Sequence, residues 1–139
     1  QDVINLSPKV VVILSGINDI AENTGPSSVE MIENNIISMA ELAKTNNINV
    51  ILCSILPASD FPWSPSIKPA KIVLELNKKI KLYAKKNNML YVDYFSVMKN
   101  ENNGMRSELA NDGIHPNKLG YSIMEPIIEK AIQESLLKQ

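Results

Sequence analysis

The chain has 139 residues, of which 45% are hydrophobic and 21% charged, and its formal net charge is −1. This balance is typical of one folded domain, excludes a disordered chain, and with a single arginine argues against a nucleic-acid partner. A single cysteine excludes an internal disulfide and a cysteine-based zinc site. The longest strongly apolar run, residues 10–14, is far shorter than the roughly 20 residues of a membrane span.

Three apolar runs predict β-strands. Residues 9–15 form a continuous β-branched run that ends at Gly16, residues 49–55 form a second run, and residues 89–92 form a shorter third. Continuous runs of this kind are typical of strands buried on both faces of a parallel sheet.

Helical patterns fill the gaps between and after these strands. A capping box that starts at Ser27 precedes apolar residues at helical spacing over 29–43, and a second amphipathic pattern covers 69–86. A last helix is predicted over 118–137, where Pro126 should kink or split it. Strands alternating with helices predict right-handed crossovers and an α/β fold with a three-layer, mostly parallel sheet.

Ligands of open parallel α/β sheets bind beyond the carboxyl ends of the strands, which directs attention to three loops. These loops cover residues 15–25, 54–68 and 93–117. The first contains Gly-Ile-Asn-Asp at 16–19, and the third contains Asp-Gly-Ile-His at 112–115. The candidate polar residues are therefore expected on one rim of the sheet.

Asp112 and His115 are three residues apart, with a glycine between them. This spacing lets the carboxylate accept from the imidazole Nδ1–H, which leaves Nε2 free to take a proton. The alternative is a surface turn whose histidine caps the following helix.

Three further residues are candidates at this rim. The Asn18 amide is placed to donate to a developing oxyanion, or else Asn18 is only a turn former. Asp19 is expected to hold the Asn18 loop through backbone hydrogen bonds. Asp93 ends the third strand, and we expect it to be structural, because one histidine and scattered carboxylates make a poor metal site.

The combination of Gly-x-Asn-Asp after a buried strand and Asp-x-x-His-Pro before the last helix resembles the SGNH/GDSL family of serine ester hydrolases. His115-Pro116-Asn117 with Gly120-Tyr121 is also similar to the family's continuation into that helix. The resemblance implies a flavodoxin-like sheet of strand order 2-1-3-4-5.

The resemblance also implies roles for individual residues. Asn18 would help to form the oxyanion hole, with Gly16 and Asp19 supporting its loop. Asp112 and His115 would be the acid and base of a Ser-His-Asp triad. Such an enzyme needs no metal or organic cofactor.

One departure from the family pattern is serious. The family's nucleophile lies in a Gly-Asp-Ser block near the N-terminus, and a second block supplies an oxyanion-hole glycine; neither occurs here. The comparison implies that residues 1–139 are a single SGNH-like domain, incomplete at its N-terminus by a strand–helix–strand unit. Ser15 and Ser54 end strands on the correct rim, but neither lies in a nucleophile elbow, so we expect no nucleophile in this chain.

The sequence therefore predicts an acyl or acetyl esterase that hydrolyses a small ester, such as an acetylated carbohydrate, with the chain alone inactive. Trp63 in the second loop would wall the acyl pocket or stack on a sugar; alternatively it covers the end of the helix layer. Expected partners are the missing N-terminal segment or a second copy, which would pair with the edge strand 9–15. The alternative function is a non-catalytic binding module on the same scaffold.

Overall fold

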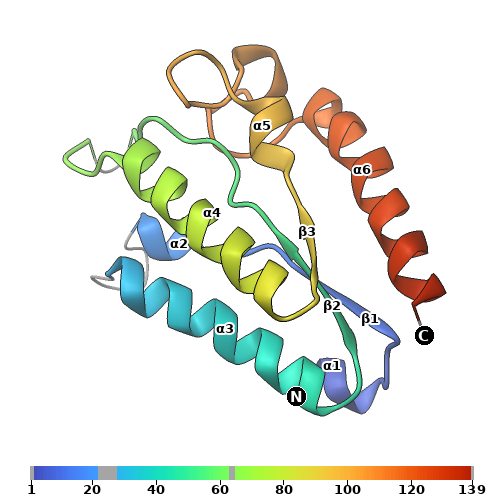
Figure 1. Ribbon diagram of the computed structural model, residues 1–139. Coiled ribbons are helices and arrows are strands. Elements are labelled where there is room, and N and C mark those ends of the chain that lie inside the picture. Colours follow the sequence, from blue (N-terminus) through green and yellow to red (C-terminus); the bar gives the residue numbers. More distant parts are fainter. Residues whose placement is uncertain (1, 22–27, 63–64, 139) are drawn as a thin grey trace.

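A three-stranded parallel sheet forms the centre of the chain in the computed structural model, which describes residues 2–21, 28–62 and 65–138 (Figure 1). Its strands are β1 (Val10–Ile13), β2 (Asn49–Cys53) and β3 (Leu90–Val92), in the order β1-β2-β3. The register pairs Val10 with Asn49 and Ile51 with Leu90. The predicted strands and their parallel arrangement are confirmed.

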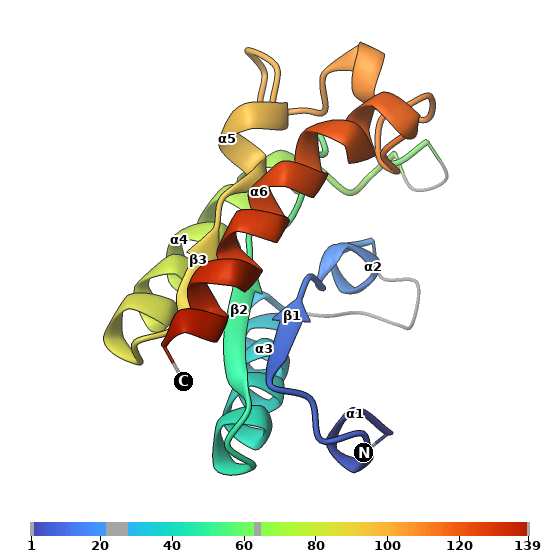
Figure 2. The same cartoon turned by 90° about the vertical axis from the view of Figure 1, so that its right-hand side faces the viewer.

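Helices cover both faces of this sheet. The helices α3 (Val29–Thr45) and α4 (Pro69–Lys86) pack on one face, and α6 (Lys118–Leu137) packs on the other (Figures 1 and 2). The remaining elements are short: α1 (Asp2–Asn5), α2 (Ile17–Ile20), α5 (Tyr94–Met98) and the 3₁₀ helix η1 (Ser107–Leu109). The predicted three-layer α/β fold is confirmed. No helix in the described part of the chain is long and apolar enough to cross a membrane.

Two helix features differ from the sequence prediction. Ser28 caps α3 by accepting from Met31 N at 3.1 Å, and the predicted cap, Ser27, lies outside the described residues. Helix α6 continues through Pro126, so of the two predicted effects of this proline the split is wrong, while the kink stays a prediction. Packing of α6 along β2 and β3 offsets the loss of one backbone donor at the proline.

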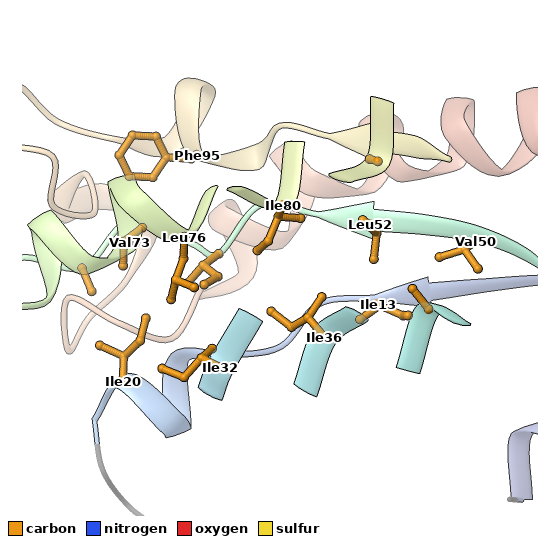
Figure 3. Close-up of a cluster of buried hydrophobic side chains, with 14 of the residues drawn as sticks. Ile13, Ile20, Ile32, Ile36, Val50, Leu52, Val73, Leu76, Ile80 and Phe95 are labelled. Carbon is orange, nitrogen blue, oxygen red and sulfur yellow. The ribbon is translucent and has the colours of Figure 1, made fainter. Parts of the chain in front are cut away.

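Side chains of the sheet alternate between two hydrophobic clusters. Figure 3 shows Val50 and Leu52 of β2 on the α3 and α4 side, among Ile36 and Ile80. The residue between them in sequence, Ile51, belongs to the cluster beneath α6. Strand β2 is therefore buried on both faces, as its sequence predicts.

Strand β1 is less covered than its sequence predicts. It pairs with β2 alone among the described strands, and Val12 and the following Leu14 are 38% and 43% exposed. A groove of about 360 Å³ follows β1, lined by Ile4, Val11, Val12, Ile13, Leu14, Ser15, Met39, Leu42, Ala43 and Ile48. Strand β1 therefore lies at the edge of the described sheet, as the strand order implied by the family resemblance predicts, although its apolar run alone favours burial on both faces.

Candidate active site

The loops that follow the strands meet at one end of the sheet. Figure 2 shows α2 and the start of α6 toward this end, with α1 at the other. A cleft of about 210 Å³ lies here, lined by Leu14, Ser15, Ile17, Ile55, Leu56, Ile114, His115, Pro116 and Tyr121. The structure thus brings the loop after β1 beside the loop that leads into α6, as the strand polarity predicts.

Asp112 and His115 form a direct pair at this cleft. The imidazole Nδ1 lies 2.7 Å from Asp112 Oδ2, while Asp112 Oδ1 accepts from the backbone N–H groups of Ile114 and His115, both at 2.8 Å. Gly113 has a φ of 78°, a conformation that favours glycine, so the turn suits this sequence. A proton on Nδ1 leaves Nε2 as an acceptor.

The pair fixes the charge of its carboxylate. The hydrogen bond from the His115 side chain, followed by those from the backbone N–H groups of His115 and Ile114, lowers the pKa of Asp112 to about 2. Asp112 is therefore ionised at any pH at which an imidazole is neutral. Both side chains are exposed, at 67% for His115 and 45% for Asp112, so solvent reaches the pair.

The Asn18 loop is shaped by a glycine. Gly16 has a φ of 116°, and a Cβ there would lie 3.0 Å from Ile55 Cδ1, so a side chain would be both strained and crowded. Ile20 N donates to Gly16 O at 2.9 Å and closes the single turn of α2. Asn18 is exposed on this turn and follows Ile17, which lines the cleft. Asp19 is half-buried on the same turn, and its support of the loop stays a prediction.

Asn77 is a buried residue at this end that the sequence analysis missed. From α4 its Oδ1 accepts from Ile55 N at 2.6 Å and its Nδ2 donates to Ile55 O at 3.0 Å. Ile55 packs against Gly16, which begins the Asn18 loop. By holding Ile55, Asn77 therefore helps to position that loop. The available signal was a polar residue on the apolar face of α4, between Leu76 and Ile80.

The two alternative serines occupy different environments. Ser54 is fully buried, and its Oγ accepts from Phe95 N at 2.9 Å, so it joins β2 to α5 rather than facing the cleft. Ser15 is half-buried and lines the same cleft as His115.

Two other predicted residues fall away from the cleft or outside the description. Asp93 caps α5: its Oδ1 accepts from Ser96 N at 3.0 Å and its Oδ2 from Ser96 Oγ at 2.6 Å, a structural arrangement. Trp63 lies outside the described residues. Among the residues that the structure does describe, no three His, Cys, Asp or Glu side chains are grouped to hold a metal ion.

Comparisons with known proteins agree with this architecture. The chain is 48% identical to a GDSL-like lipase from Bacteroides thetaiotaomicron, with a TM-score of 0.93 over 96% of this chain and 66% of that one. It is 47% identical to a predicted acylhydrolase from Bacteroides fragilis, with a TM-score of 0.93 over 97% of this chain and 66% of the other. A mutant acetyl-xylooligosaccharide esterase from Geobacillus, at 22% identity, shares the fold, with a TM-score of 0.73 over 95% of this chain and 63% of that one. No curated protein matches the chain.

The chain thus spans 66% of the length of each of the two Bacteroides proteins. The family model of GDSL-like lipases and acylhydrolases matches residues 1–123, which include β1, the Asn18 loop and the Asp112–His115 pair. On this match, the chain belongs to the GDSL-like lipase/acylhydrolase family.

Proposed function

We propose that the chain carries the base, the acid and one oxyanion donor of a serine esterase, while a separate segment supplies the nucleophile. His115 is the base, Asp112 the acid that orients it, and Asn18 the oxyanion donor. The observation that carries the proposal is the 2.7 Å contact between His115 Nδ1 and Asp112 Oδ2, which leaves Nε2 as the proton acceptor. Membership of an acylhydrolase family gives this pair its chemical context.

The reaction follows from these groups. His115 Nε2 takes the serine proton as the serine Oγ attacks the ester carbonyl carbon, and the Asn18 amide donates to the oxyanion that forms. The imidazolium then gives its proton to the departing alcohol. Water, deprotonated by the same imidazole, then attacks the acyl carbon; the bond to the serine Oγ breaks as the imidazolium returns the proton to Oγ, and the free acid leaves. Activity falls at acid pH because a protonated imidazole accepts no proton, whereas Asp112, with a pKa of about 2, stays charged.

The uncovered edge of β1 suggests where the nucleophile segment binds. The groove along β1 and the cleft beside His115 share two lining residues, Leu14 and Ser15. A strand that paired with β1 and filled this groove would therefore end next to the imidazole. Unpaired backbone and exposed apolar side chains favour binding of such a strand. The segment is the partner that we propose, with a second copy of the chain as a substitute in its absence.

The proposed substrate is a small ester. The cleft has a volume of about 210 Å³ and is lined mainly by aliphatic side chains, which suits a short acyl group. An acetylated carbohydrate is our first candidate for the alcohol part. A distant structural neighbour is an acetyl-xylooligosaccharide esterase, which is in keeping with this choice.

Complementation tests the proposal. The chain would be coexpressed with the part of the Bacteroides thetaiotaomicron lipase that has no counterpart here, and hydrolysis of p-nitrophenyl acetate would be measured. We expect the chain alone to be no better than buffer, the complex to turn over, and His115→Ala in the complex to remove turnover. A complex that forms but stays inactive would contradict the proposal.

The alternative function is a non-catalytic binding module on the same scaffold, which a nucleophile segment with the serine replaced would favour. A complex that binds an acetylated oligosaccharide in calorimetry without hydrolysing it would support that alternative.

A further inference from the structure

Asn117 lies where the loop of residues 110–116, here called the site loop, runs into α6. Its side-chain Oδ1 accepts from Gly120 N at 3.0 Å and so caps the helix. Its Nδ2 donates to Glu108 O at 3.0 Å, and its backbone N–H donates to Leu109 O at 2.8 Å. Asn117 therefore connects the two ends of the site loop, because it binds both the segment before the loop and the first turn of α6 after it.

Close packing at Gly120 strengthens this connection. A Cβ at Gly120 would lie 2.6 Å from Leu109 O and 2.9 Å from Pro116 Cβ, so only glycine lets the first turn of α6 approach both stems of the loop. Within the loop, Asn117 Nδ2 also lies 3.4 Å from Asn111 Oδ1. The site loop is thus held from its base and not only by its own turn.

We propose that Asn117 is a positioning residue for the reaction, holding the site loop so that His115 and Asp112 stay paired. The inference rests on the proposed function of that pair. Both side chains are exposed, and Ile114 is the buried residue between them. The site loop is short, and Ala110 and Ile114 are its buried residues. Opening of its base would let Asp112 and His115 move apart, and small displacements of a catalytic group are costly.

Two substitutions separate this role from helix capping. Asn117→Ser keeps a strong N-cap acceptor for Gly120 N, but its shorter side chain does not reach Glu108 O. Asn117→Asp also keeps the cap, but it places a carboxylate oxygen opposite the Glu108 carbonyl, where the amide now donates. Ser28→Ala is the matched control, because it removes a helix cap outside the site loop and its stems.

The experiment uses two readouts. In the chain alone, NMR follows the titration of the Asp112 carboxyl and the Nδ1–H signal of the single histidine. In the complex with the nucleophile segment, kcat and KM are measured for p-nitrophenyl acetate. For both Asn117 variants we expect the pKa of Asp112 to rise from about 2 toward its ordinary value of 3.8, and the Nδ1–H signal to weaken. We expect kcat to fall roughly 10–100-fold with little change in KM.

Ser28→Ala should lower the unfolding temperature but leave the Asp112 titration and the Nδ1–H signal unchanged. If Asn117→Ser and Asn117→Asp titrate and turn over as the wild-type chain does, Asn117 is only a helix cap and the inference is wrong. An inactive wild-type complex would contradict the proposed function instead, and the Asp112 titration would still decide the role of Asn117. If one variant unfolds, the other carries the test.

Discussion

Strands β1 and β2 have similar apolar sequences but different surroundings. In β2, four of the five residues are buried, and the strand pairs on both sides. In β1, Ile13 alone is buried, and Val12 is 38% exposed. The difference shows that an apolar sequence indicates how much burial a strand tolerates, whereas the elements packed beside the strand decide how much of it is buried. The contrast follows from position, because β2 lies between two strands and β1 pairs with β2 alone among the described strands.

We expect the largest effect from the loop that follows β1, because in our proposal this loop takes part in catalysis only when the nucleophile segment is bound beside β1. In the complex with the nucleophile segment, Asn18→Ala should lower kcat roughly 10²–10³-fold while KM moves less. His115→Ala should cost more, because activation of the nucleophile is lost as well. Asn35→Ala, at an exposed position on α3, is the control. Steady-state kinetics check this, and full turnover by the Asn18 variant would make Asn18 a turn former only.

Matched truncations of the two strands should differ in their cost. Leu52→Ala on β2 removes a fully buried side chain and should lower the free energy of unfolding by about 2–5 kcal/mol. Val12→Ala on β1 should cost less than about 1 kcal/mol in the chain alone. Urea unfolding measures both. Equal costs would mean that β1 is covered in solution, and the cost at Val12 should grow when the nucleophile segment is bound.

Thiol reactivity sharpens the same contrast. Burial raises the pKa of Cys53 on β2 to about 11, so below that pH it holds little of the reactive thiolate. Val12→Cys in a Cys53→Ala background places an exposed thiol on β1 and should react with a disulfide reagent at pH 8 roughly 10²-fold faster than Cys53. Stopped-flow absorbance gives both rates. Equal rates would contradict the difference in burial, and binding of the nucleophile segment should slow the Val12→Cys variant.

Association of the chain is the mildest expected effect. The uncovered β1 should pair with a second copy or retain the missing segment, so light scattering at micromolar concentration should give a mass above 15.4 kDa. Val12→Lys should restore the single-chain mass. A wild-type chain of 15.4 kDa that unfolds cooperatively without a bound peptide would show that the edge is protected.

Local patterns predicted the three strands, the three long helices and the Asp112–His115 pair of the candidate site. The strands and long helices were predictable because their periodicity is local, and the Asp112–His115 contact because the two residues share one turn. The clamp from Asn77 to Ile55 was not predictable, because it joins α4 to the loop after β2. The edge position of β1 was predictable only through the family resemblance, because the apolar run of the strand does not tell which strands lie beside it.

We propose that this chain holds the base and acid of an esterase but not its nucleophile. Labelling with a fluorophosphonate, followed by peptide mass spectrometry, tests it most directly. We predict no labelling of the chain alone, and stoichiometric labelling of a serine in the added segment once the complex with the Bacteroides thetaiotaomicron part has formed. Stoichiometric labelling of the chain alone at Ser15, which lines the cleft with His115, or at Ser54 would contradict the claim.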